Sequence, residues 1–226
     1  MNNEILKSIR SHLAASAPHD AREQVSRRLT QINADLISVD LRQSAADLFR
    51  LNLEAVNGHC VIAQGDTDIA RALTQIIADL QKTNLRAQRI AISDNPIVER
   101  LMYLTDLEIE ALAIAPNDIF SYDVGITTAQ AAIAETGTLV LDSADERHRL
   151  VSLVPPVHIA IVDASRICET LGEALSLLRN GKELSRAVTF VTGPSRTADI
   201  ELTLTVGVHG PQELYVIINE GPPLTR

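Results

Sequence analysis

The first 57 residues carry apolar side chains at helical spacing. Pro18 separates two stripes, and a third predicted helix begins near Ser44 and ends before Gly58, where a C-cap glycine belongs. The stripes are narrow and the helices rich in charge, so residues 1–57 are predicted to form a helical arm that packs on a larger body or on a partner. The stripe residues are Ile5, Ile9, Leu13, Val25, Leu29, Ile32, Leu48, Leu51 and Ala55.

From residue 58 onward, short β-branched runs alternate with helical patterns. This alternation predicts an α/β domain over residues 58–226, with a largely parallel sheet flanked by helices on both faces. The predicted strands are 60–63, 89–92, 109–113, 123–126, 138–141, 150–162 (interrupted at 155–156), 187–191 and 214–218. The predicted helices are 66–80 (capped by Asp66 or Thr67), 96–104 (with Pro96 in its first turn), 129–134 and 171–180.

Residues 201–206 carry two conflicting signals. Their strict alternation indicates a strand, whereas their position between two strands, after a polar loop, favours a helix. We expect the helix, which would make 188–218 a βαβ unit with the polar loop at the carboxyl end of its first strand. Open α/β sheets tend to bind ligands at that edge.

Composition narrows the class of protein. Hydrophobic residues make up 46% of the chain but aromatic residues only 3%, so the core must be aliphatic. A net charge of −9 argues against a nucleic-acid or anionic-membrane surface. Two distant cysteines, Cys60 and Cys168, suggest a reduced cytoplasmic protein and are too few for an iron–sulfur cluster. We expect no secretory signal and no membrane span.

The densest chemistry lies in Gly193–Glu201, followed by Gly207–Pro211. Ser195 and Thr197 are placed to cap a helix or to offer hydroxyls to an anion. The expected ligand contacts in these segments are Gly193, Ser195, Arg196, Thr197, Asp199, Glu201, Gly207 and Gly210.

Arg196 has two interpretations. Its guanidinium can grip a phosphate or carboxylate with two parallel hydrogen bonds, so we expect it to face a small anionic ligand. Alternatively, it pairs with Asp199 or Glu201 and holds the turn.

A second candidate is Glu135, which follows an Ala-rich segment and precedes Thr136, Gly137 and Thr138. Its carboxylate is expected to be partly desolvated, which would raise its pKa and suit an acid, base or nucleophile. Alternatively, it accepts hydrogen bonds from neighbouring backbone N–H groups. The three residues after it are expected ligand contacts.

Two histidines complete the candidates. His209 sits on a turn between glycines and is a candidate catalytic residue. His158, at the edge of an apolar strand, is either a ligand contact or a satisfied core residue. Since no short-spaced ligand pair is present, we predict no metal site. The motifs of P-loop NTPases, Gly-fingerprint dehydrogenases and α/β-hydrolases are absent from the sequence.

Four of these motifs occur in an order that resembles a known family. They are Ala134–Leu139, Pro155–His158, Gly193–Glu201 and Gly207–Pro211. Together they resemble the LUD domain of the lactate utilization protein C family, over about residues 59–219. The resemblance implies a fold similar to the NagB/RpiA/CoA-transferase-like superfamily. It also implies a role in oxidation of L-lactate to pyruvate, alongside separately encoded iron–sulfur subunits.

Two functional hypotheses remain open. In the first, the chain is an accessory subunit of lactate oxidation that binds a small anion or nucleotide. In the second, it is a stand-alone enzyme acting on a CoA thioester, phosphosugar or folate-like substrate, with Glu135 as nucleophile. Either way we expect Glu135, Arg196 and His209 to converge on one pocket. The sequence leaves the cofactor and the oligomeric state open.

Overall fold

The computed structural model describes residues 44–85, 87–105, 107, 111–113, 119–143, 149–179, 185–198, 204–206 and 210–225. The chain divides into two units, residues 1–43 and Ser44–Arg226, and every described residue belongs to the second. The two helices predicted before residue 44 therefore lie outside the described residues.

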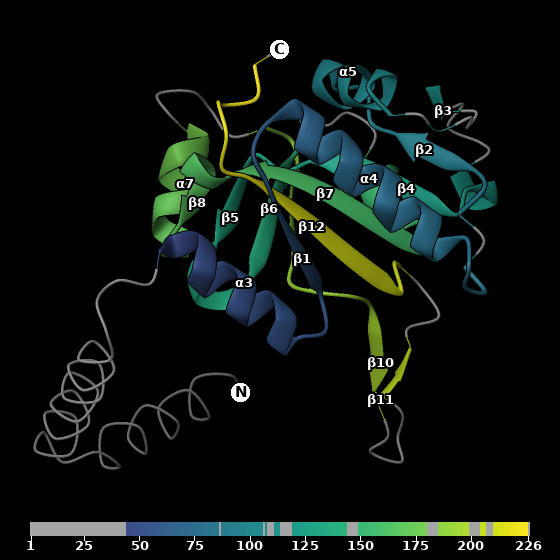
Figure 1. Ribbon diagram of the computed structural model, residues 1–226. Coiled ribbons are helices and arrows are strands. Elements are labelled where there is room, and N and C mark those ends of the chain that lie inside the picture. Colours follow the sequence, from purple (N-terminus) through teal and green to yellow (C-terminus); the bar gives the residue numbers. More distant parts are fainter. Residues whose placement is uncertain are drawn as a thin grey trace, which may run out of the picture. The chain divides into compact units, whose positions relative to one another are not determined.

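A six-stranded, wholly parallel sheet forms the centre of the fold (Figure 1). The inner strands β7 and β4 are buried at every position, as their β-branched sequences predict for strands covered on both faces. In sheet order the strands are β1 (His59–Ala63), β12 (Glu213–Asn219), β7 (Val157–Asp163), β4 (Val124–Thr128), β2 (Ile90–Ile92) and β3 (Ala111–Ala113).

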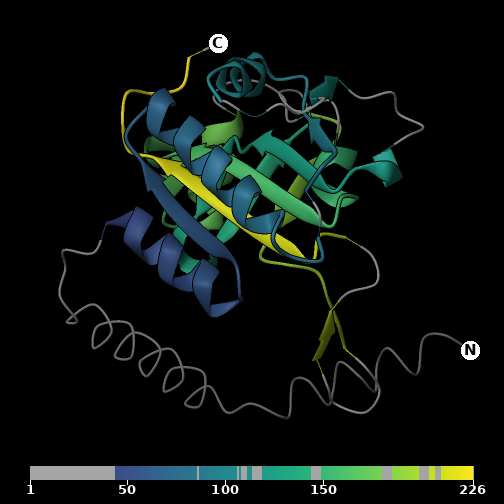
Figure 2. The same ribbon diagram turned by 45° about the vertical axis from the view of Figure 1, so that its right-hand side comes forward.

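Helices α4 (Asp66–Leu80) and α5 (Pro96–Tyr103) cover one face of this sheet (Figure 2). The apolar stripe of α4 lies against isoleucines from several strands, which makes this layer an aliphatic core. Its fully buried members include Ile69, Leu73, Ile77, Leu101, Ile126, Ile159, Ile161 and Ile217.

A second, four-stranded sheet packs on the other face together with α3 (Ala45–Ala55), and α7 (Leu171–Arg179) packs on the opposite side of that second sheet. Its strands, in order, are β8 (Ile167–Cys168), β5 (Ala131–Ile133), β6 (Thr138–Asp142) and β9 (Val188–Val191). The remaining elements are η1 (Ile119–Ser121), η2 (Ala134–Thr136), α6 (Leu150–Leu153), η3 (Ala164–Arg166) and the antiparallel pair β10 (Arg196–Ala198) and β11 (Leu204–Val206). The predicted α/β architecture, a mostly parallel sheet flanked by helices, is confirmed.

Helix α3 belongs to the α/β unit. Phe49 and Leu53 are fully buried in the cluster that lines the second sheet, and the compact unit begins at Ser44. The structure thus places the unit boundary before α3, whereas the predicted boundary followed residue 57. The helix ends as a Schellman motif in which Asn57, with φ 64°, takes the left-handed position and Gly58 N–H donates to the Leu53 carbonyl.

Three predicted elements were wrong. Residues 129–134 are not a helix, because 131–133 pair with β6 and β8, and this pairing outweighs the helix propensity of alanine. Residues 150–153 form α6, so the strand starts only at Val157. Residues 204–206 are strand β11, paired with β10, while β9 lies in the second sheet. The expected βαβ unit over 188–218 therefore does not exist.

Candidate ligand-binding cavity

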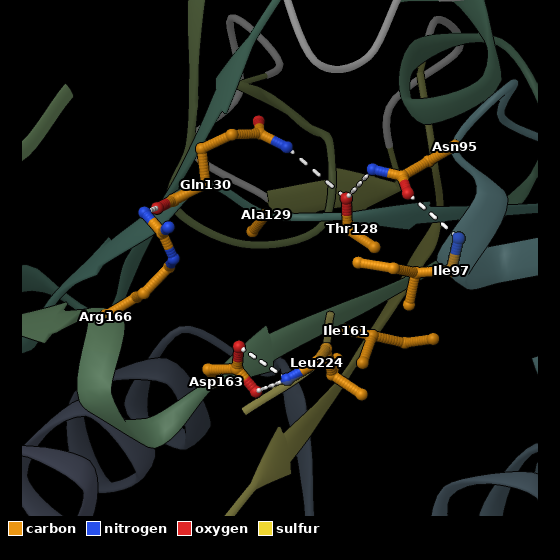
Figure 3. A pocket seen from close by; sticks show the side chains of 9 residues that line it. All are labelled: Asn95, Ile97, Thr128, Ala129, Gln130, Ile161, Asp163, Arg166 and Leu224. Carbon is orange, nitrogen blue, oxygen red and sulfur yellow. Dashed lines mark hydrogen bonds between the residues drawn. The ribbon is translucent and has the colours of Figure 1, made fainter. Parts of the chain in front are cut away.

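A polar cavity of about 180 Å³ lies where the parallel strands end (Figure 3). Its residues come from the carboxyl ends of β4 and β7, the start of α5, the short helix η3 and the C-terminal segment. They are Asn95, Ile97, Thr128, Ala129, Gln130, Ile161, Asp163, Arg166 and Leu224. Ligands commonly bind at this edge of open α/β sheets.

Asn95 caps helix α5 and faces the cavity. Its Oδ1 accepts a 3.0 Å hydrogen bond from the Ile97 backbone N–H, and its Nδ2 donates to Thr128 Oγ1 at 2.9 Å. Because a backbone N–H can only donate, the side-chain atom that faces it must be the oxygen. The cap therefore fixes the amide group so that its N–H₂ end turns toward Thr128.

Gln130 is held in the same way on the opposite side. The Asp142 backbone N–H donates to its Oε1 at 2.7 Å, which turns Nε2 toward Thr128 Oγ1 at 3.3 Å. The side chain is only 7% exposed. Two buried amides thus present hydrogen-bond donors around one hydroxyl, and Figure 3 shows this arrangement.

Arg166 and Asp163 supply the charges of the cavity. Arg166 donates one of its five N–H groups to the Gln130 carbonyl at 3.2 Å, and its side chain is exposed. Both carboxylate oxygens of Asp163 accept from the Leu224 backbone N–H at 3.2 Å, and Oδ1 also accepts from Asn219 Nδ2 at 2.7 Å. Chain groups therefore already satisfy the one carboxylate, while the guanidinium keeps donors to offer.

The lining favours ligands that bring acceptors. Its polar side chains are two amides oriented as donors, one hydroxyl, one guanidinium and one occupied carboxylate. A small carboxylate or phosphate matches this set. Among the described residues, no three His, Cys, Asp or Glu side chains gather in a way that would hold a metal ion.

Glu135 lies on the surface rather than in this cavity. Its Oε1 accepts from the Leu171 N–H at 3.2 Å, where α7 begins, and its own N–H donates to the Glu169 carbonyl at 3.1 Å. The side chain is exposed, so the expected desolvation is absent. These contacts match the alternative in which the carboxylate binds backbone N–H groups, here at a helix N-terminus.

The residues after Glu135 lie against helix α3. Thr136 and Thr138 share a 2.7 Å hydroxyl contact, and Thr138 continues to Thr192 at 2.9 Å. Gly137 has φ 64°, and a Cβ there would overlap the backbone N of Leu53. Gly193 has φ 142°, and a Cβ there would lie 2.9 Å from Val56 Cγ2. These positions let α3 approach the second sheet closely.

A model of the LUD domain matches residues 23–219. The chain belongs to the LUD domain family.

Several relatives of this LUD domain are curated proteins. An uncharacterized protein of Neisseria meningitidis serogroup B is 35% identical over 150 residues, which is 65% of this chain and 61% of that protein. Lactate utilization protein C 1 of Bacillus mycoides is 45% identical over 103 residues, and lactate utilization protein C of Bacillus subtilis 41% identical over 103. Those alignments span 43% of this chain and 44% and 43% of the relatives, so the match covers under half of each.

A solved structure supports the fold. A DUF162 family protein from Deinococcus radiodurans superposes with a TM-score of 0.57 at 22% identity, over 78% of this chain and 96% of that one. In the described part of the LUD domain, no helix has the length and hydropathy that a bilayer crossing requires.

His158 lies in the core of the LUD domain. It is fully buried on β7, and Nε2 lies 2.9 Å from Thr127 Oγ1. Burial lowers the pKa of this imidazole from 6.5 to about 3, so it is neutral at physiological pH. The burial matches the core alternative, but only Nε2 has a partner, since Nδ1 is buried without a hydrogen bond among the described residues; His158 does not line the cavity.

The motif around Arg196 is described only in part. Arg196 is exposed at the start of β10, Ser195 N–H donates to the Pro211 carbonyl at 2.7 Å, and Gly210 lies beside the Ser195 side chain. The backbone of Thr197 pairs with Thr205. The other candidates of this region, Asp199, Glu201, Gly207 and His209, lie outside the described residues. Convergence of Glu135, Arg196 and His209 on one pocket therefore stays a prediction.

None of the predicted site residues that the structure describes lines the cavity. Sequence reasoning missed Asn95, Thr128, Gln130, Asp163 and Arg166 because each is a single polar residue rather than part of a dense motif. One signal was present, since a polar residue that directly follows a buried parallel strand lies at the edge where ligands bind. Thr128 and Asp163 end such strands, and Asn95 precedes a proline that starts a helix.

Proposed function

We propose that this LUD domain is a ligand-binding component of bacterial lactate utilization and that its cavity binds a small oxygen-rich anion, such as a short carboxylate. Arg166 would bind the anion with its guanidinium, and Gln130 would donate a further hydrogen bond. The observation that carries the proposal is the locked orientation of the two cavity amides, whose nitrogens converge on the Thr128 hydroxyl beside the Arg166 guanidinium.

The relatives support the biological setting. Proteins named lactate utilization protein C share 41–45% identity with this chain over 103 residues. We propose a matching role here, in the cytoplasm, alongside separately encoded iron–sulfur subunits that carry the electrons. Co-purification from the native host, with and without lactate induction, tests the partnership. It fails if no iron–sulfur protein is retained and deletion leaves growth on lactate intact.

Isothermal titration calorimetry of the full chain with L-lactate, pyruvate and inorganic phosphate tests the binding itself. We expect Arg166→Ala to weaken binding by about tenfold or more, because hydrogen bonds between charged partners are lost. Arg166→Lys keeps the charge but loses the fork geometry, so its affinity should fall in between.

Arg196→Ala provides the matched comparison. Arg196 is the guanidinium that the sequence motif favoured, and it too is exposed. If Arg196→Ala abolishes binding while Arg166→Ala leaves it unchanged, the anion binds at the motif and the cavity proposal is wrong. Circular dichroism of each variant shows whether the fold is retained.

The alternative, CoA transfer through Glu135, gains no support from the described geometry, because the Glu135 carboxylate is exposed and bonded to the start of α7. Borohydride trapping after incubation with an acyl-CoA remains the direct check. Reduction of Glu135 would reinstate that enzyme class.

A further inference from the structure

Residues 221–225, here called the strap, run along the carboxyl edge of the main sheet. Side chains of the α/β unit hold the strap in this position. Leu224 N–H donates to Asp163, Asn219 Nδ2 donates to the Pro222 carbonyl at 2.8 Å, and Arg100 Nη1 donates to the Thr225 carbonyl at 2.6 Å. The strap has no regular secondary structure, so these contacts carry much of its attachment.

The strap contributes to two cavities. Leu224 forms part of the wall of the 180 Å³ anion cavity, as Figure 3 shows. A second cavity of about 370 Å³ lies at the start of α4 and beside α5. Of the described residues that line it, three belong to the strap; the described set is Gly65, Asp66, Arg100, Pro222, Pro223 and Thr225. We therefore interpret the strap as a partition between them.

We propose that the strap is a specificity element that restricts the anion cavity to small ligands. While these hydrogen bonds hold the strap in place, the cavity volume is about 180 Å³, which is below the roughly 300 Å³ at which pockets for drug-sized ligands begin. Released, it joins the two cavities into one groove and withdraws the Leu224 N–H from Asp163. That carboxylate, only 9% exposed when latched, would then face an anion directly. The inference rests on the proposed anion-binding function.

Gly221 offers a way to release the strap without touching the cavity. A Cβ at Gly221 would lie 2.5 Å from the backbone N of Gly65 and 2.8 Å from the carbonyl carbon of Gln64. Backbone atoms cannot yield as a flexible side chain can, so Gly221→Ala should push the strap away from the β1–α4 turn. Gly172→Ala is the matched control, because its nearest contact is Thr170 Oγ1 at 3.9 Å.

Thiol labelling with reagents of graded size measures the access. Ala129→Cys places a thiol in the cavity wall, where Ala129 is 5% exposed, and peptide mass spectrometry separates it from Cys60 and Cys168. The full chain is treated with methyl methanethiosulfonate or with a bulky fluorescein-linked methanethiosulfonate. Ile97→Cys serves as a second reporter on another wall of the same cavity.

We expect Gly221→Ala to raise the bulky-to-small rate ratio at least about tenfold, the change expected when a hydrogen bond to a charged group is lost. Asp163→Asn should act in the same direction, because the amide keeps one acceptor oxygen for Asn219 Nδ2 but loses the second acceptor and the negative charge that bind the Leu224 N–H. Gly172→Ala should leave the ratio unchanged. If the bulky-to-small labelling ratio stays unchanged in both Gly221→Ala and Asp163→Asn, the proposal that the strap restricts ligand size is wrong.

Failure of the strap and failure of the anion site give different results, because labelling does not depend on anion affinity. If the labelling ratio stays constant in the release variants while Arg166→Ala still weakens lactate binding, only the proposal about the strap is wrong. If the ratio rises but lactate, pyruvate and phosphate all fail to bind, the anion-binding function is wrong, and with it the restriction to small anions.

Discussion

The cavity and the motif segments use polar residues in different ways. In the cavity, backbone N–H groups fix Asn95 and Gln130 so that their amide nitrogens converge on the Thr128 hydroxyl in the cavity wall. In the motif segments, Gly137 and Thr138 serve contacts within the protein, against α3 and across the second sheet. In the part of the motif segments that the structure describes, these residues therefore mark where backbone and side chains fit closely.

The sharpest way to break this comparison is Gly137→Ala. The left-handed φ of 64° and the overlap of a new Cβ with Leu53 N combine, so we expect a loss of about 3 kcal/mol or more in the free energy of unfolding. Urea denaturation measures it.

Gly172→Ala in α7 is again the control, and it should be neutral or slightly stabilising because alanine favours helix. If Gly137→Ala were as stable as this control but lost anion binding, the motif glycine would belong to a ligand site after all.

His158 sharpens the comparison through pH. Its folded-state pKa of about 3 lies below the ordinary 6.5, so between these values the unfolded chain binds a proton that the folded chain does not. The stabilising contribution is therefore complete above pH 6.5 and is lost as pH falls toward 3. Between pH 7 and 5 we expect a loss of about 2 kcal/mol from this group.

The measurement is urea denaturation of wild type and His158→Gln at both pH values. The variant should lose about 2 kcal/mol less over the same interval, which isolates His158 from other titrating groups. Equal losses in the two proteins would show that the imidazole is not buried and neutral, and would return it to the list of ligand contacts.

Glu135→Ala is expected to have the smallest effect. Losing the acceptor at the start of α7 should cost about 1 kcal/mol, as for other residues that cap helix N-termini. Glu135→Gln keeps an acceptor oxygen and should cost less. If Glu135→Gln abolished growth on lactate while its free energy of unfolding stayed unchanged, the capping role would be contradicted.

The sequence predicted most of the layered fold because strongly patterned segments behave as their pattern indicates. The stripe of α4 and the proline at the start of α5 are local signals that no tertiary contact opposed. Residues 131–133 and 204–206 were predicted to be helical but form strands, because pairing with other strands decided their conformation.

The cavity was harder to predict for a related reason. Thr128 and Asp163 are distant in sequence, and only the parallel order of β4 and β7 brings their ends together. The orientation of the Gln130 amide depends on the Asp142 N–H, which lies on β6, the strand that pairs with β5 directly after Gln130. Such relations have no local sequence pattern, whereas a glycine-rich motif is visible at once.

Strand order has a consequence for how the chain is made. β12 (Glu213–Asn219) lies between β1 and β7, so residues 59–63 must wait for residues 215–219 before they can pair. During synthesis, the sheet cannot close until this late segment has left the ribosome. A nascent or truncated chain that lacks β12 would leave one side of β7 and the inner edge of β1 without hydrogen-bond partners. Because unpaired strand edges promote aggregation, interruption late in translation should favour aggregation more strongly than the stability of the finished domain implies.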